Sequence, residues 1–178
     1  MTENEFTDDR DFVLTRLLAA PRERVFQAWI DPREWEQWFG PKGFTSQVVE
    51  TDIQPGGRFR IVMRSPEGVD YPLLGVYHEI LPPERLIYTD SMAEHPPAMI
   101  AELNERYHAN RGVGDVPLGA LVTVTFDDRD GQTLLTVSTH FESFAARETH
   151  VEMGMGDGWG ETLDRLEEFV SAPARVRR

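Results

Sequence analysis

The chain has 178 residues, which suits one ordinary domain and is enough to bury a sizeable core. Its hydrophobic fraction of 40% and charged fraction of 28% are typical of a globular protein rather than a disordered one. The formal net charge of −13 disfavours nucleic acid and anionic membrane surfaces as partners, because both are bound through Lys and Arg. The absence of cysteine excludes disulfides, thiolate nucleophiles and Cys-ligated zinc.

No run of 18 apolar residues occurs, so the sequence predicts no membrane span. The first eleven residues are polar and acidic and lack the apolar centre of a signal peptide. Together with the absence of cysteine, these features favour a cytoplasmic location. We expect residues 1–10 to form a flexible tail, residues 11–171 to form one domain, and residues 172–178 to form a second tail.

The first elements of the domain are a strand and two short helices. The strand is expected over residues 11–20, and Pro21 after it suits the first position of a helix. Asp31 followed by Pro32 is typical of the N-cap and first turn of a second helix. That helix ends in the loop of residues 40–43, which contains two glycines and a proline.

The middle of the chain predicts a series of strands joined mainly by short turns. Residues 58–65 alternate, with Phe59, Ile61 and Met63 on one face and arginines on the other, as in a half-buried antiparallel strand. The turn of Asp130 and Gly131 is a strong hairpin signal. The other predicted strands span residues 46–53 (with Val49, Thr51 and Ile53 on one face), 73–81, 85–89, 120–127 and 132–140. Such a series predicts an antiparallel sheet, and the added helices make the fold class α+β.

Residues 91–118 interrupt the series of strands. This stretch is too long for a hairpin connection and contains a predicted helix over residues 98–110. It is interpreted as an insertion within the domain. A lid over a cavity, a partner-binding segment and a tolerated surface insertion all fit the pattern.

The end of the domain predicts a long amphipathic helix. One apolar stripe is formed by Met155, Trp159, Leu163, Leu166 and Val170, at spacings of 4, 4, 3 and 4. Only the sheet is large enough to cover this stripe.

The start of this helix is unusually rich in glycine, at positions 154, 156, 158 and 160. Each glycine within a helix costs about 0.5–1 kcal/mol relative to alanine. Close approach to a strand, room for a ligand, or a bend in the helix would each explain the run. If the helix continues back to Arg147, Glu148 and Glu152 lie on the apolar stripe. They would then be polar anchors in a pocket, or simply acids that favour a helix N-terminus.

The sequence carries no recognisable catalytic or metal-binding motif. The five histidines lack metal-ligand spacing, and His78 and His140 are best explained as structural residues in strands. A nucleophile elbow, a phosphate loop and a dinucleotide fingerprint are absent. We therefore predict no metal, cofactor or catalytic residue. Whether the protein is an enzyme stays open, and the sequence favours a protein that is not one.

Four motifs in order along the chain resemble a known superfamily. They are Phe39–Phe44, Pro55–Phe59, Gly75–Leu86, and Gly158-Trp159 with Leu163 and Leu166. From about Phe12 to Val170 the chain resembles the START-like superfamily, in particular the branch similar to the activator of the heat-shock-protein-90 ATPase. The resemblance implies the helix-grip fold, in which a curved antiparallel sheet of six to seven strands surrounds a long C-terminal helix. It also implies a cavity between the sheet and that helix.

Members of this superfamily bind lipids, polyketides, plant hormones or aromatic compounds, and some catalyse cyclisation or hydrolysis in the cavity. The resemblance therefore predicts a binder of a small hydrophobic molecule. The residues expected on the cavity wall are Trp29, Trp38, Phe59, Met63, Tyr77, Glu152, Met155, Gly156, Trp159 and Leu163.

Two other functions remain open at this point. One is a cyclase- or hydrolase-like enzyme that uses the same cavity. The other is a protein-interaction or co-chaperone-like module that uses residues 91–118 or a surface around Trp35. A chaperone partner is doubtful, because the chaperone-activating relatives carry a separate N-terminal domain for which 178 residues leave no room. A homodimer formed through a sheet edge also stays open.

Overall fold

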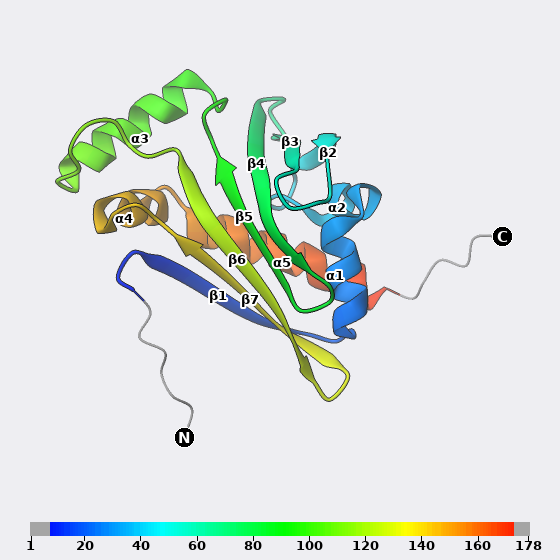
Figure 1. Cartoon of the computed structure of the whole chain (residues 1–178). Coiled ribbons are helices and arrows are strands. Elements are labelled where there is room, and N and C mark those ends of the chain that lie inside the picture. The colour runs from blue at the N-terminus through cyan, green and yellow to red at the C-terminus, as the bar shows by residue number, and fades with distance from the viewer. Residues whose placement is uncertain (1–7, 173–178) are drawn as a thin grey trace.

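The computed structural model describes residues 8–172, which form a seven-stranded antiparallel sheet and five helices (Figure 1). The strands are β1 (Asp11–Leu18), β2 (Thr45–Thr51), β3 (Arg58–Arg64), β4 (Asp70–Leu81), β5 (Arg85–Ser91), β6 (Gly119–Arg129) and β7 (Gln132–His140). The helices are α1 (Arg22–Ile30), α2 (Pro32–Trp38), α3 (Pro97–Ala109), α4 (Phe144–Glu152) and α5 (Met155–Ser171). Residues 1–7 and 173–178, which hold most of the two predicted tails, lie outside the described residues.

The sheet has the strand order β1-β7-β6-β5-β4-β3-β2 and curves around α5 (Figure 1). The chain passes from one edge strand, β1, to the other, β2, through α1 and α2. These two helices pack against each other and against α5. On α5, Leu163, Leu166 and Val170 are buried in the main core. The predicted α+β class and helix-grip architecture are therefore confirmed.

Most predicted strands occur within a few residues of their expected ends, but the register within β2 differs from the prediction. The pairing with β3 shifts between Val48 and Glu50. Because a bulge displaces the alternation by one residue, Val48 packs against the core while Val49 is 54% exposed. The expectation that Val49 shares the inner face with Thr51 and Ile53 was wrong.

The two short helices form as predicted and build one compact unit. The Asp31 side chain accepts a hydrogen bond of 2.9 Å from the Arg33 backbone N–H, which confirms the N-cap. The Trp38 indole N–H donates to the Ala28 carbonyl at 3.0 Å and joins the two helices. Trp35 is 5% exposed and packs on Phe39, so it forms part of the core and leaves no Trp35 surface for a partner.

The C-terminal helical segment is divided into α4 and α5, so of the explanations left open for the glycine run, a break in the helix is the one that occurs. Gly154 between them has φ of +91°, a left-handed conformation that ends a helix and that glycine adopts without strain. Glu148 and Glu152 therefore lie on α4 and not on the apolar stripe of α5. Glu148 pairs with Arg147, and the exposed Glu152 accepts a hydrogen bond from the Asn110 amide at 3.1 Å.

Residues 91–118 form an excursion from the hairpin of β5 and β6. Ser91 pairs with Gly119, so the two ends of the excursion lie side by side. Between them, α3 packs against α4 and buries Leu103 and Tyr107 in a second hydrophobic cluster. That cluster also contains Phe141 and Ala146. The segment is thus an integral part of the packed domain.

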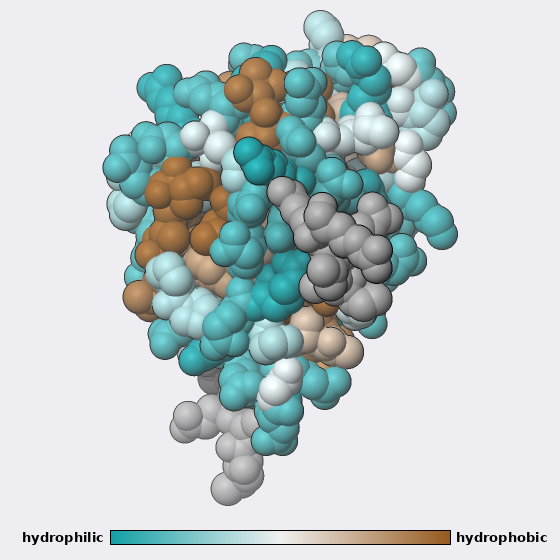
Figure 2. Space-filling model, turned by 90° about the vertical axis from the view of Figure 1, so that its right-hand side faces the viewer, coloured by the Kyte–Doolittle hydropathy of each residue, from teal (hydrophilic) through white to brown (hydrophobic). Residues whose placement is uncertain are grey.

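The surface seen from the right of Figure 1 is mainly hydrophilic, and its hydrophobic residues occupy limited areas (Figure 2). Within residues 8–172, no helix is both long and apolar enough to span a membrane.

Substitution of Gly75 should test the packing of the inner face. A Cβ atom at Gly75 would lie 2.1 Å from Cζ of Phe59 and 2.5 Å from the carbonyl oxygen of Thr89. We expect Gly75→Ala to lower the free energy of unfolding by roughly 2–3 kcal/mol, because Phe59 must leave its position. Urea denaturation measures this loss.

The matched control is Gly160→Ala, since no atom lies within 4 Å of a Cβ placed there. This helical substitution should raise the free energy of unfolding by about 0.5–1 kcal/mol. A Gly75→Ala protein as stable as the wild type would contradict the packing described for this face.

Candidate ligand-binding cavity

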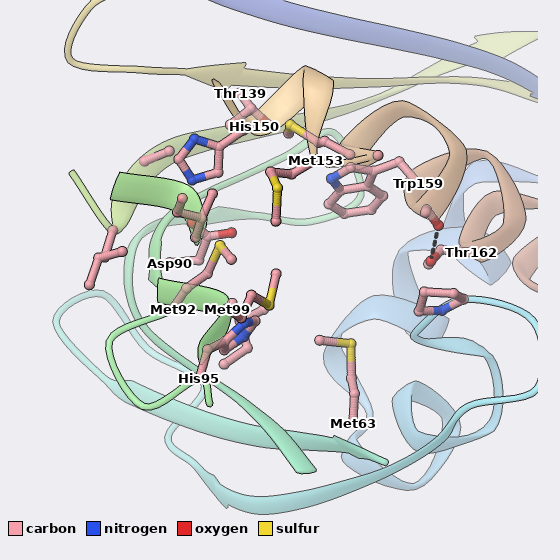
Figure 3. Close-up of a pocket in the computed structure, with 18 of the residues that line it drawn as sticks. Met63, Asp90, Met92, His95, Met99, Thr139, His150, Met153, Trp159 and Thr162 are labelled. Carbon is pink, nitrogen blue, oxygen red and sulfur yellow. Dashed lines mark hydrogen bonds between the residues drawn. The ribbon is translucent and has the colours of Figure 1, made fainter. Parts of the chain in front are cut away.

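A cavity of about 260 Å³ lies between one end of the concave sheet face and the helices that cover it (Figure 3). The sheet contributes one or more inward side chains from each of five adjacent strands: Met63, Leu73, Asp90, Ala120 and Thr139. The remaining wall comes from α3, α4, α5, the loops beside them and the Phe39–Pro41 turn. The cavity therefore depends on segments from most of the chain.

The walls are mainly apolar and unusually rich in methionine. Five of the six methionines in the sequence line the cavity: Met63, Met92, Met99, Met153 and Met155. Methionine is flexible and polarizable, so it adapts to ligands of different shape. The indole of Trp159 completes the wall opposite several of these residues (Figure 3).

Asp90 is an acidic residue in these apolar surroundings. It follows Leu86 and Tyr88 on the inner face of β5, because alternate residues of a strand share a face. Its side chain is half-buried and faces the cavity (Figure 3). Burial raises the pKa of Asp90 to about 7, although a hydrogen bond with the backbone at Ala120 opposes this increase. Near neutral pH the carboxyl group can therefore donate or accept a proton.

Two further polar side chains in the wall are buried without partners. His95 and Thr139 are 7% and 3% exposed, and both line the cavity. Neither ring nitrogen of His95 nor the hydroxyl oxygen of Thr139 has a hydrogen-bond partner within the described residues. Burial, with a smaller contribution from His150, lowers the pKa of His95 to about 4, so its ring is neutral at physiological pH. Each unpaired buried group costs about 1–3 kcal/mol, which a bound polar ligand would offset.

His150 on α4 is a fourth polar group in the wall. Its Nδ1–H donates to the Ala146 carbonyl at 2.8 Å, and its ring packs on Phe141 with centroids 4.8 Å apart. Burial lowers the pKa of His150, so the neutral ring is favoured. Because the proton sits on Nδ1, Nε2 is left as a hydrogen-bond acceptor.

Of the ten residues expected on the cavity wall, three line it: Met63, Met155 and Trp159. Five others fill the apolar core at the opposite end of the concave face: Trp29, Trp38, Phe59, Tyr77 and Leu163. There Trp29 lies 4.9 Å from Trp38, and Phe59 lies 5.2 Å from Tyr77, measured between ring centroids. Inward-facing aromatic residues thus occur along the whole inner face of the sheet, whereas the cavity occupies only one end of that face.

Glu152 and Gly156 also lie outside the cavity lining. Glu152 is exposed because α4 ends before the apolar stripe of α5 begins. A Cβ atom at Gly156 would point to the ring of Phe12 on β1, at 3.4 Å, instead of into the cavity. The break at Gly154 explains the position of Glu152, and the direction of the Gly156 Cβ explains why that residue is absent from the wall.

Five polar lining residues were missing from the predicted wall: Asp90, His95, Thr139, His150 and Thr162. Alternation could have found two of them, because Asp90 continues the Leu86 and Tyr88 face and Thr139 continues the face of Val137. His95 and His150 carried no such local signal, since their positions depend on how α3 and α4 pack. Within residues 8–172, no group of three or more His, Asp or Glu side chains is arranged to hold a metal ion.

An open antiparallel sheet around a C-terminal helix, with a cavity between them, defines a START-like domain of the helix-grip fold. Residues 19–171 match the family described as Activator of Hsp90 ATPase homolog 1-like protein. The chain therefore belongs to this family. No curated protein matches the chain.

Solved structures agree with this assignment. A protein from Nitrosomonas europaea is 28% identical, with 91% of this chain and 94% of that chain covered and a TM-score of 0.71. A protein from Arthrobacter aurescens is 24% identical, with 93% and 88% covered and a TM-score of 0.77. One from Mycobacterium smegmatis is also 24% identical, with 94% of each chain covered and a TM-score of 0.74. The latter two show the shared fold.

The raised pKa of Asp90 predicts a pH-dependent stability. Between the usual carboxyl pKa of about 4 and the folded-state pKa of about 7, the folded protein holds a proton that the unfolded chain has released. The contribution of Asp90 to stability therefore falls as the pH rises through this window. Asp90→Asn removes this loss and should be more stable than the wild type by roughly 2–4 kcal/mol at pH 8.

Urea unfolding at pH 5 and pH 8 measures the difference between the two proteins. His95 and His150, whose pKa values are lowered, oppose the trend of Asp90 because they lose stability as the pH falls. Since both proteins carry these histidines, the difference between them isolates Asp90. An advantage of Asp90→Asn that is the same at both pH values would contradict a buried, titrating carboxyl group.

Proposed function

We propose that this protein binds a small, mainly apolar molecule in the cavity between the sheet, α3, α4 and α5. The observation that carries the proposal is the wall itself, in which methionine, leucine and aromatic side chains surround a few polar groups. Binding pockets for small molecules have this composition. Family membership supports the same function, since the resembled superfamily uses its cavity for ligands.

The volume of the cavity limits the size of the ligand. At about 260 Å³ it exceeds the ~150 Å³ cavity that takes up benzene in an engineered protein. It is slightly below the range of about 300–1,000 Å³ for pockets that hold drug-sized compounds. A molecule of one or two rings, or an aliphatic chain of similar volume, fits this space.

The position of α3 supports a role for residues 91–118 in covering the cavity. Met92, His95, Met99, Leu103 and Leu118 from this segment line the cavity. A surface insertion without function would not be expected to supply so much of the wall. We propose that this segment is the cover of the site.

One observation favours a cyclase- or hydrolase-like enzyme as a second candidate. Such an enzyme needs an ionisable group in the cavity, and neither Glu152 nor Tyr77 lines it. Asp90 does, and its pKa of about 7 suits general acid–base catalysis at neutral pH. Both candidate functions use the same cavity and both require ligand binding.

Substitutions on α5 separate ligand binding from helix stability. Gly158 lines the cavity, and a Cβ atom placed there has only Pro41 nearby, at 3.9 Å. We expect Gly158→Leu to fill part of the cavity and to weaken the binding of indole or naphthalene at least about tenfold, because a buried leucine takes the space of the ring. Amide chemical-shift titrations by NMR give the affinities and show whether the shifted residues line the cavity.

Gly160→Leu is the control, since it makes the same change on the same helix where no atom lies within 4 Å. Its affinity for either probe should stay within about twofold of wild type, because α5 keeps its cavity face unchanged. Equal affinities for the two variants would place the ligand outside this cavity. Binding of neither probe to the wild-type protein would count against the proposed function.

A further inference from the structure

Four of the five polar side chains of the cavity wall lie together, and the fifth, Thr162, lies near Trp159 with its hydroxyl donating to the Gly158 carbonyl at 2.7 Å. In Figure 3, Asp90, His95, Thr139 and His150 lie on one side of the cavity, opposite Trp159 and Met63. The sheet register agrees, because Asp90 pairs with Ala120 on β6 and Thr139 pairs with Val122 on the same strand. A ligand that fills this cavity therefore has one end against polar groups and the rest against apolar ones.

The charges of the wall disfavour an anionic ligand. Among the described residues that line the cavity, Asp90, His95 and His150 are the ionisable ones, and none is Lys or Arg. A carboxylate or phosphate would meet the Asp90 carboxyl group without a cation to neutralise it, which is unfavourable at short distance. The net charge of −13 also repels anions as they approach.

The hydrogen-bonding groups of the wall are mainly acceptors. They comprise the two carboxyl oxygens of Asp90, Nε2 of His150, one neutral ring nitrogen of His95 and the hydroxyl oxygen of Thr139. The free donors are fewer, namely one N–H of His95 and the Thr139 hydroxyl, because the Nδ1–H of His150 and the Thr162 hydroxyl already donate to backbone carbonyls. A primary ammonium group supplies three donors and a positive charge, which complements this set.

We infer that the cavity binds a small apolar molecule that carries a primary amine, with its ammonium group against Asp90, Thr139 and His150. The inference rests on the proposed function, and it names the class of ligand. His95 and Thr139 support it independently of Asp90, because both are more than nine-tenths buried and have no partners of their own within the described residues.

Such a ligand makes binding depend on pH. The titratable groups around Asp90 are His95 and His150 in the cavity wall and the buried Tyr88 on its own strand. Between pH 6 and pH 8, the pKa of about 4 for His95 and the raised pKa of Tyr88 keep these two groups neutral, and the lowered pKa of His150 favours its neutral ring. Asp90 is therefore the wall group that changes charge in this range. It must be ionised to pair with an ammonium group, and its ionised fraction rises about tenfold between these two pH values.

Naphthylethylamine and naphthylethanol form a matched pair of probes, since they share a ring and a two-carbon chain and differ only in the polar end. Isothermal titration calorimetry at pH 6 and pH 8 measures both affinities. The amine should bind at least about tenfold tighter than the alcohol at pH 8, and about tenfold tighter at pH 8 than at pH 6, following the ionisation of Asp90. The affinity of the alcohol should change less than about twofold, because it carries no charge in this range.

Asp90→Asn should remove the advantage of the amine and its pH dependence, while the alcohol still binds. The control is Glu152→Gln, which removes one exposed negative charge on α4 without touching the cavity lining. At pH 8 this variant should still bind the amine at least about tenfold more tightly than the alcohol. If both variants lose the preference for the amine to a similar extent, the preference comes from the net charge of the protein, and the inference is overturned.

The alcohol probe separates a failure of amine recognition from a failure of ligand binding as such. If the alcohol binds as tightly as the amine at both pH values, the apolar cavity remains and the amine inference is overturned. If neither probe binds, the inference falls together with the proposed function.

Discussion

The packing of α5 on the concave face of the sheet organises this molecule. Leu163, Leu166 and Val170 of α5 meet the aromatic residues of α1, α2 and the central strands, and the main core forms there. These aromatic side chains pack edge to face or tilted, as between Trp29 and Trp38, and fill their half of the concave face. The other end of the face is covered by smaller and more flexible side chains, and the cavity lies at that end.

The break at Gly154 determines where the cavity is and what enters its wall. Because the left-handed glycine ends α4, the chain changes direction before α5 begins. α4 is thereby free to pack against α3, and the two helices form a second hydrophobic cluster with Phe141. The cavity lies where the two clusters meet, so residues of α3, α4 and α5 all reach it.

The polar groups on one side of the cavity lower the stability of the fold. A carboxyl group with its pKa raised by burial, together with unpartnered groups on His95 and Thr139, lowers the stability of a domain of this size. Apolar residues at the same positions would pack without this cost. Such local losses of stability are typical of sites that bind or react. The same argument favours a ligand with a polar end over a purely apolar one.

The sequence by itself determined the class of fold, because each signal for it is local. Alternation in residues 58–65, the cap at Asp31 and the hairpin at Asp130 and Gly131 act within a few residues, and all three formed as predicted. The inward faces followed as well, apart from Val49, where a bulge shifted the register. Inward aromatic residues such as Phe59 and Tyr77 were therefore correctly assigned to the interior.

Only the tertiary structure decided which part of that interior is empty. A cavity is what remains after side chains from distant segments have packed, so its position depends on volumes summed over the whole fold. Seven of the ten residues expected on the wall lie outside it for this reason, while His95 and His150 reach it through the packing of α3 and α4. The charge state of Asp90 depends on the same packing. Its carboxyl group is removed from water by the surrounding protein, rather than by its neighbours in the sequence.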